Sequence, residues 1–145
     1  MSKKLYVCGF LFDPLFRAVV LIRKIRPLWQ AGKWNGVGGK IEAGETPLQA
    51  MQREFHEEAG LKVESWKPFC VLVGEDYEVH FFMATAPEFN TVKTCTAEVI
   101  EIHRVESLGW IITVPNLCWL IPMAMRHWDK NDSTVPFYKI EEAQP

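Results

Sequence analysis

Apolar and polar residues are arranged along the chain in a pattern that predicts strands mixed with two helices. Short apolar or alternating runs, bounded by turn-forming residues such as Asp13-Pro14, are typical of strands. The third and fourth of these runs flank Gly74-Glu75-Asp76, so they are expected to pair as a hairpin. The five runs expected to form strands are residues 5–12, 18–22, 66–73, 77–84 and 97–105.

The first helix is expected between two clear end signals. Thr46 suits the N-cap, Pro47 suits the first helical position, and Gln49 completes a capping box. Gly60 is well placed to end the helix. Helical spacing within it predicts a buried stripe that consists of Leu48, Met51, Phe55 and Ala59.

A second helix is expected over residues 117–127, although Pro122 lies inside it. The glycine-rich residues 33–45 are expected to form a loop with room for a short strand, and residues 87–96 a second loop. The polar tail after residue 129 is expected to be loosely held. Strands mixed with two separated helices predict an α+β domain in which a helix covers each face of a mixed sheet.

Length and charge limit the class of protein. The 145 residues suit one domain, and the formal net charge of −2 argues against stable binding to nucleic acid or to an anionic membrane. No run reaches the roughly 18 apolar residues of a membrane span, and no cleavage site follows the first apolar run, so no signal peptide is expected. The four cysteines lie in apolar stretches, which predicts reduced, buried thiols and a cytoplasmic location. They are Cys8, Cys70, Cys95 and Cys118.

Candidate chemistry is concentrated in the segment from Arg53 to Glu58. On a helix, Glu54, Glu57 and Glu58 share one side through their three- and four-residue spacings, and they repel one another. One interpretation is a solvated acidic face. The other is a site for a hard divalent cation such as Mg²⁺ or Mn²⁺, which prefers oxygen ligands.

A glycine-rich loop leads directly into this helix and favours the metal interpretation. Gly38 and Gly39 allow close backbone approach, so a carbonyl there is a candidate metal ligand. Lys40 and the neighbouring amides are candidates to face phosphate oxygens. Taken alone, the loop would be interpreted as a plain tight turn.

Residues 39–61, GKIEAGETPLQAMQREFHEEAGL, resemble the signature of the Nudix hydrolases. The family pattern is glycine, five residues, glutamate, seven residues, Arg-Glu, an apolar residue, any residue, Glu-Glu, any residue, glycine and an apolar residue. Every fixed position is met, with Phe55 where an aliphatic residue is commoner. The resemblance implies a Nudix-type α/β/α sandwich with a mixed sheet between helices. It also implies hydrolysis of a phosphoanhydride bond with Mg²⁺, or with Mn²⁺ as a substitute.

Residue roles follow from this resemblance. The three glutamates would bind Mg²⁺ together with the Gly38 carbonyl, and Arg53 would hold the carboxylates in place. Glu45 would brace the loop, and Lys40 would lie near the phosphates.

Family members often add an acid from a later strand or loop, and Glu98 is the candidate here. The alternative is that Glu98 is an ordinary exposed strand residue. Either Glu54 or Glu98 would take the proton from the attacking water. The implied metal ligands are therefore Gly38, Glu54, Glu57, Glu58 and Glu98.

Residues 33–40, KWNGVGGK, are similar to MutT-like enzymes that hydrolyse oxidised purine nucleoside triphosphates. In that subgroup an asparagine at the position of Asn35 hydrogen-bonds the base, because an amide offers both donors and an acceptor. The alternative is that Asn35 makes a turn beside Gly36.

Residues 114–122 resemble the segment of that subgroup in which a Trp-Pro-Asp-Asp run lines the base pocket. Here Val114 replaces the aromatic residue and Asn116 replaces an acid, so a stacking surface and a carboxylate are lost. Asn116 is the second candidate for reading the base. Trp119 either contacts the base or belongs to the core.

The resemblance implies hydrolysis of a nucleoside triphosphate, with oxidised or modified purine deoxynucleotides as one substrate group, to a nucleoside monophosphate and pyrophosphate. An ADP-ribose or dinucleoside polyphosphate pyrophosphatase would use the same motif and is the alternative. A non-catalytic nucleotide-binding module would usually have lost some of the acids, which are all present here. The expected partner is a small nucleotide, and a homodimer is an open option because dimers are frequent in the family.

Overall fold

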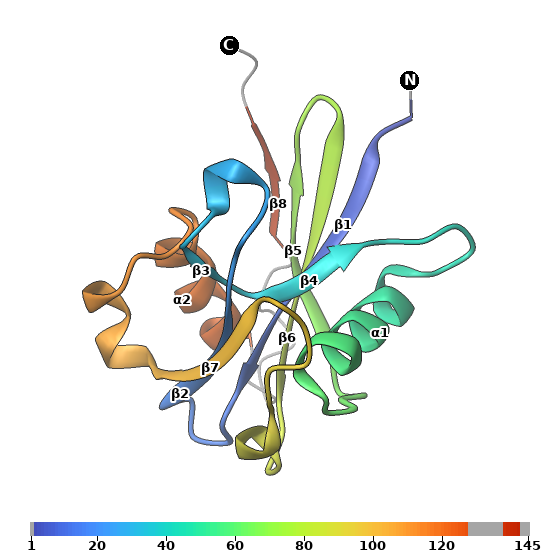
Figure 1. Cartoon of the computed structure of the whole chain (residues 1–145). Coiled ribbons are helices and arrows are strands. Elements are labelled where there is room, and N and C mark those ends of the chain that lie inside the picture. Colours follow the sequence, from blue (N-terminus) through green and yellow to red (C-terminus); the bar gives the residue numbers. More distant parts are fainter. Residues whose placement is uncertain (1, 128–137, 143–145) are drawn as a thin grey trace.

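The computed structural model describes residues 2–127 and 138–142 and has a mixed sheet at its centre (Figure 1). Its strands are β1 Lys4–Phe12, β2 Ala18–Arg23, β3 Trp34–Asn35, β4 Val37–Lys40, β5 Lys67–Val73, β6 Tyr77–Thr85, β7 Val99–Arg104 and β8 Tyr138–Glu141. Six of them follow the order β3-β2-β1-β6-β5-β8, while β4 pairs with β1 and β7 pairs with β2. The pairs β1–β6 and β5–β8 are parallel, and the others are antiparallel.

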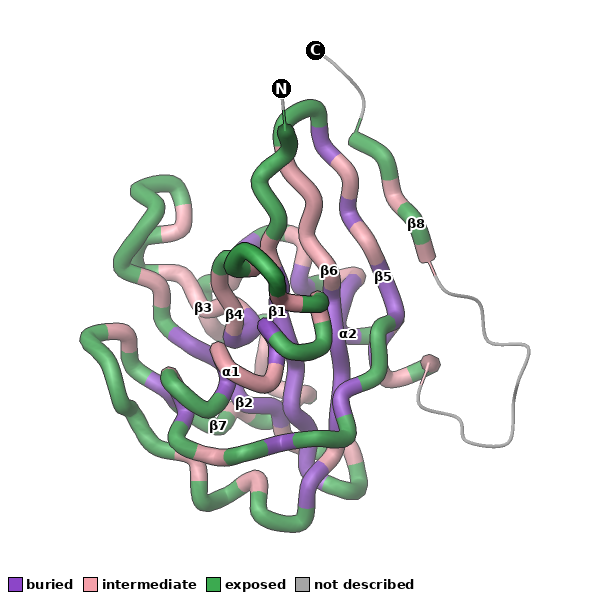
Figure 2. Tube along the Cα trace, turned by 90° about the vertical axis from the view of Figure 1, so that its right-hand side faces the viewer, coloured by how far each residue is buried: buried purple, intermediate pink, exposed green. Residues whose placement is uncertain are grey.

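Two helices, α1 Pro47–Ala59 and α2 Leu117–His127, cover opposite faces of this sheet. The short 3-10 helices among the described residues are η1 Leu28–Gln30, η2 Phe89–Thr91 and η3 Val105–Trp110. Successive side chains of a strand point to opposite faces, so Val7 and Leu11 of β1 pack with α1 while Phe10 packs with α2. Figure 2 shows the buried segments gathered along the central strands. The predicted α+β sandwich is confirmed.

The ends of α1 follow the local signals in the sequence. The Thr46 hydroxyl accepts the Gln49 N–H at 3.1 Å, and the Gln49 side chain accepts the Thr46 N–H at 2.9 Å. Gly60 ends the helix with a φ of 75°, a conformation that favours glycine. The predicted buried stripe is wrong at Leu48, which is 39% exposed, because the small Ala50 faces the core in the first turn.

Residues 138–142 are held against the sheet, which differs from the expectation of a loosely held tail. β8 pairs with β5, and the Glu142 N–H donates to the Val73 carbonyl at 2.9 Å. The hydroxyl of Tyr77 also donates to the Glu142 carboxylate. The rest of the tail, residues 128–137 and 143–145, lies outside the described residues.

The cysteines divide into two pairs. Cys8 and Cys70 are buried as predicted, whereas Cys95 and Cys118 are exposed, which corrects the expectation for those two. Cys118 lies on the outer side of α2, where Pro122 and Arg126, four and eight positions further on, are also exposed. Among the described residues, no helix combines the length and apolar character needed to cross a membrane.

Candidate active site

Two glycines of β4 allow the acidic face of α1 to lie against the sheet. A Cβ on Gly38 would lie 1.9 Å from the Val7 carbonyl oxygen, because β4 runs that close to β1. A Cβ on Gly39 would lie 2.5 Å from the Glu54 carboxylate. The lack of a side chain therefore lets β4 approach β1 closely at Gly38 and lets Glu54 of α1 lie against β4 at Gly39.

The Arg53 guanidinium connects the acids of α1 with the preceding loop. Its Nε and Nη2 donate to the two carboxylate oxygens of Glu45 at 2.7 and 2.8 Å. Its Nη1 donates to Glu54 at 2.8 Å and to Glu57 at 3.3 Å, and Nη2 also reaches the Lys40 carbonyl at 3.0 Å. One side chain thus fixes the loop, the end of β4 and two of the glutamates.

Glu45 is the loop residue that pairs with Arg53. Its carboxylate accepts the Glu42 N–H at 2.9 Å in addition to the two bonds from Arg53. The hydrogen bonds from Arg53 lower the pKa of Glu45 to about 2, and those with Glu45 raise the pKa of Arg53. Both groups therefore stay charged across the physiological pH range.

Glu54 and Glu58 lie in a desolvated environment. Burial raises the pKa of Glu54, against the opposing effect of Arg53. Burial, followed by the nearby Glu54 carboxylate, raises the pKa of Glu58 to about 7. The Glu58 Oε2 atom is shut off from solvent and has no hydrogen-bond partner among the described residues.

The chemistry of these acids suits a hard divalent cation. Their donors are all oxygens, and neighbouring buried carboxylates are unfavourable unless a positive charge neutralises them. As they stand, no three carboxylate, imidazole or thiol side chains of the described residues converge closely enough to hold a metal ion. Glu57 stands apart, since its side chain is 57% exposed and its carboxylate is held by Arg53. Glu54 and Glu58 are the ligand candidates that the fold brings together.

Glu98 lies outside the motif but within electrostatic reach of Glu58, whose pKa it helps to raise. The Glu98 carboxylate accepts a hydrogen bond from Lys24 Nζ at 3.1 Å and from the Ile25 N–H at 2.6 Å. It is therefore a fixed, paired carboxylate beside the acidic cluster and not an ordinary exposed strand residue.

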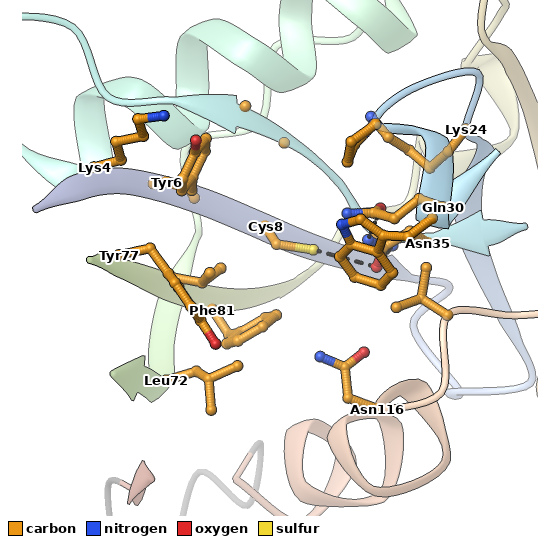
Figure 3. Close-up of a pocket in the computed structure, with 18 of the residues that line it drawn as sticks. Lys4, Tyr6, Cys8, Lys24, Gln30, Asn35, Leu72, Tyr77, Phe81 and Asn116 are labelled. Atoms are coloured by element: carbon orange, nitrogen blue, oxygen red, sulfur yellow. Dashed lines mark hydrogen bonds between the residues drawn. The ribbon is translucent and has the colours of Figure 1, made fainter. Parts of the chain in front are cut away.

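A cavity of about 870 Å³ opens beside the β4 glycines, on the α2 side of the sheet (Figure 3). Asn35 lines it from β3, and Asn116 reaches toward it from the start of α2. Cys8 and Phe81 form part of the floor from the neighbouring strands β1 and β6. Gly38 and Gly39 line the same cavity, so the two asparagines and the backbone beside Glu54 share one space.

Two predicted site residues lie elsewhere. Trp119 is not among the residues that line the cavity and packs against the α2-side core, which favours the core interpretation of that residue. The side chain of Lys40 is exposed at the end of β4 and does not line the cavity either. The Lys40 backbone carbonyl, by contrast, anchors Arg53.

Three residues near the site were missed from the sequence. Lys24 pairs with Glu98, Gln30 accepts a hydrogen bond from Asn35, and Cys8 contacts the same asparagine. All three line the cavity. Lys24 could have been found from the sequence, since it stands at the polar end of an apolar run. Cys8 and Gln30 could not, because the fold of the chain brings them to Asn35.

Comparison with known sequences agrees with this geometry. A sequence model of the family described as "NUDIX domain" matches residues 3–118. The chain is 32% identical over 108 residues to a Mycobacterium tuberculosis protein provisionally named 8-oxo-dGTP diphosphatase 2, covering 64% of this chain and 76% of that one. It is 60% identical over 35 residues to the zebrafish (Danio rerio) oxidized purine nucleoside triphosphate hydrolase. That match covers 24% of this chain and only 22% of the zebrafish enzyme.

Solved structures share the fold at low sequence identity. A MutT structure from work on Aliivibrio salmonicida and Vibrio cholerae superposes with a TM-score of 0.74 at 22% identity, covering 88% of this chain and 100% of that one. The NUDIX domain of Shewanella oneidensis NrtR, solved with ADP ribose, gives a TM-score of 0.76 at 16% identity over 88% and 89%. At these identities the likeness shows the fold alone.

Proposed function

This chain belongs to the NUDIX family, and on that premise we propose that it is a pyrophosphohydrolase of nucleoside triphosphates. The products would be a nucleoside monophosphate and pyrophosphate, and purine nucleotides with an oxidised or modified base are the substrate group to test first. The observation that supports this most strongly is the shared cavity. One end holds two amide side chains, Asn35 and Asn116, and the backbone of Gly38 and Gly39 leads from it to the acids of α1.

The cavity's layout suits a base and a phosphate chain held at separate points. Asn35 and Gly38 are three residues apart on adjoining short strands, a span of roughly 10 Å in extended chain. A base bound at the amides therefore directs its phosphates toward Glu54 and Glu58. The relatives named for oxidised purine nucleotides support the choice of substrate group. Val114 lines the cavity where the resembling subgroup has tryptophan, so a base bound here would lack that stacking surface.

The acids of α1 form the proposed metal site. Glu54 and Glu58, the ligand candidates that the fold brings together, would hold Mg²⁺, which when bound supplies positive charge to the phosphates and lowers the pKa of a water. Glu57, Glu98 and the Gly38 carbonyl stay predicted as further ligands. Arg53 keeps Glu54 against the strand through its 2.8 Å hydrogen bond.

The carboxylates around this cluster are suited to take up a proton. Lys24 holds Glu98 beside Glu58 and places a cation at the edge of the cavity. Glu54 or Glu98 would accept the proton of the water that attacks phosphorus. A carboxylate fixed by a hydrogen bond at one oxygen can receive the proton at the other. Arg53 donates to the Oε1 atom of Glu54, which leaves Oε2 as the oxygen for this role.

Product analysis over a panel of nucleotides with Mg²⁺ tests the proposal. We expect nucleoside triphosphates to give monophosphate and pyrophosphate, resolved by chromatography and phosphorus NMR. Release of AMP and ribose 5-phosphate from ADP-ribose, with triphosphates untouched, would assign the alternative activity. Glu58→Gln should abolish turnover, while Glu64→Gln, a change at an exposed acid outside the site, should not alter it.

A further inference from the structure

The side-chain amide of Asn35 is held in one orientation by three hydrogen bonds. Its Oδ1 accepts the Gly36 N–H at 2.8 Å and the Cys8 thiol at 3.7 Å. Its Nδ2 donates to the Gln30 side-chain oxygen at 3.0 Å. The three partners come from strand β1, which pairs with β4, from the 3-10 helix η1 and from the backbone next to Asn35 itself, and Figure 3 shows Cys8, Gln30 and Asn35 side by side.

These bonds define what Asn35 can offer to a ligand. A backbone N–H can only donate, so the Gly36 contact identifies the oxygen end of the amide without ambiguity. An amide oxygen accepts two hydrogen bonds, and Gly36 and Cys8 take both. One of the two Nδ2 hydrogens is used by Gln30. What is left for a ligand is one N–H, so Asn35 faces the cavity as a donor.

Cys8 supplies the second hydrogen bond to the Oδ1 atom of Asn35. Its thiol is nearly buried, at 6% exposure, and its sulfur would lie 2.7 Å from a Cβ on Gly36, so it is wedged against the turn. Across the cavity, the Oδ1 atom of Asn116 is buried and has no hydrogen-bond partner among the described residues. Because that oxygen is shut off from solvent, it is not offered to a ligand, and the N–H of Asn35 is the amide group that a base would meet here.

We propose that Cys8 is a positioning residue for base specificity, acting by occupying the second acceptor site of Asn35. With that site filled, Asn35 favours a base edge that places an acceptor against its N–H and rejects an edge that places a donor there. The inference rests on the proposed function, because it takes the cavity as a base pocket. Without the thiol, Asn35 can accept as well as donate, so either kind of edge group can pair with it.

Equilibrium binding of nucleoside monophosphates tests this without any turnover. Inosine and adenosine monophosphates differ in the order of acceptor and donor on the six-membered ring edge, and calorimetry gives Kd for each. We expect the wild type to prefer one of them by roughly tenfold, about the value of one hydrogen bond. Cys8→Ala should bring the two Kd values within about threefold of each other.

Two further variants separate this role from simple packing. Cys8→Ser keeps a donor toward Asn35 and should restore most of the wild-type preference. Cys70→Ala removes a buried thiol that does not line the cavity and should leave the preference unchanged.

Four results would overturn the inference. They are equal binding of the two monophosphates by the wild type, no binding of either, an unchanged preference in Cys8→Ala, and identical effects of the alanine and serine changes. Absence of pyrophosphate release from the triphosphate panel would instead refute the proposed hydrolysis, since monophosphate binding is measured independently of it.

Discussion

Replacing Gly39 by alanine should separate catalysis from folding at this site. The added Cβ would lie 2.5 Å from the Glu54 carboxylate, whereas ordinary contacts begin at 3.4 Å, so the carboxylate must move by about 0.9 Å. A Glu side chain is flexible enough to make that shift, and Gly39 is not among the residues with positive φ, so the backbone tolerates alanine. Misplacing a reacting group by about 1 Å costs on the order of 100-fold in rate. We therefore expect a folded variant whose kcat/KM is about 100-fold lower.

The neighbouring change, Gly38→Ala, is the matched control. Its Cβ would lie 1.9 Å from the Val7 carbonyl oxygen, a backbone atom that cannot turn away. The pairing of β1 with β4 must then distort, at a cost of about 3 kcal/mol, which for a chain of this size lowers Tm by roughly 6–12 °C.

Circular dichroism on heating and steady-state kinetics on the same preparations distinguish the two glycines. Gly39→Ala should melt within a few degrees of the wild type and still lose activity. A Gly39→Ala protein with full kcat/KM would show that Glu54 need not lie against β4. One as unstable as Gly38→Ala would show that the contact is structural.

The remaining predictions concern the ion pairs, the metal and the thiols. Arg53→Lys keeps the charge but loses the two-pronged contact with Glu45, and urea unfolding of the metal-free protein should show a lower free energy of unfolding than the wild type. Because Arg53 lowers the pKa of Glu45 to about 2, the carboxylate stabilises the fold above its unfolded pKa of about 4.3, and this stabilisation disappears as the pH falls toward 2. The difference in unfolding free energy between wild type and Glu45→Gln should therefore shrink over that window, and a constant difference would contradict the pairing. A chelator should stop hydrolysis, and Mg²⁺ or Mn²⁺ should restore it, in an assay of released pyrophosphate. In the native protein, the exposed Cys95 and Cys118 should react quickly with a thiol reagent. Cys8 is buried and its pKa is raised to about 12, so it should react only when the protein unfolds.

Features governed by neighbouring residues could be predicted well from the sequence. The capping signals at Thr46 and Gly60 bracket α1 because each acts within a few positions of the helix end. The spacing of Glu54 and Glu58 places both on one side of that helix for the same reason. The placement of these acids on one side of α1 therefore follows from local sequence, whereas the close approach at Gly38 depends on the pairing of β4 with β1.

Features that depend on distant pairing could not be predicted in this way. The strand β8 is four residues long and follows a polar segment, and it is defined by its pairing with β5 rather than by its own pattern. The partners of Asn35 come from separate segments, so no spacing rule connects Cys8 with Gln30. The ion pair between Lys24 and Glu98 joins residues 74 positions apart.

The parallel pairing of β1 with β6 has a consequence for how the cavity comes into being. Cys8 pairs with Phe81, 73 positions further along, so the floor joins the first strand to one that is made only after α1 and β5. Such contacts of high sequence separation carry a large loop-closure entropy and form slowly. The helix of acids can form from local interactions, whereas the floor of the cavity waits for chain closure. A fragment that ends before β6 therefore retains the acidic motif but lacks the part of the cavity floor that Phe81 supplies.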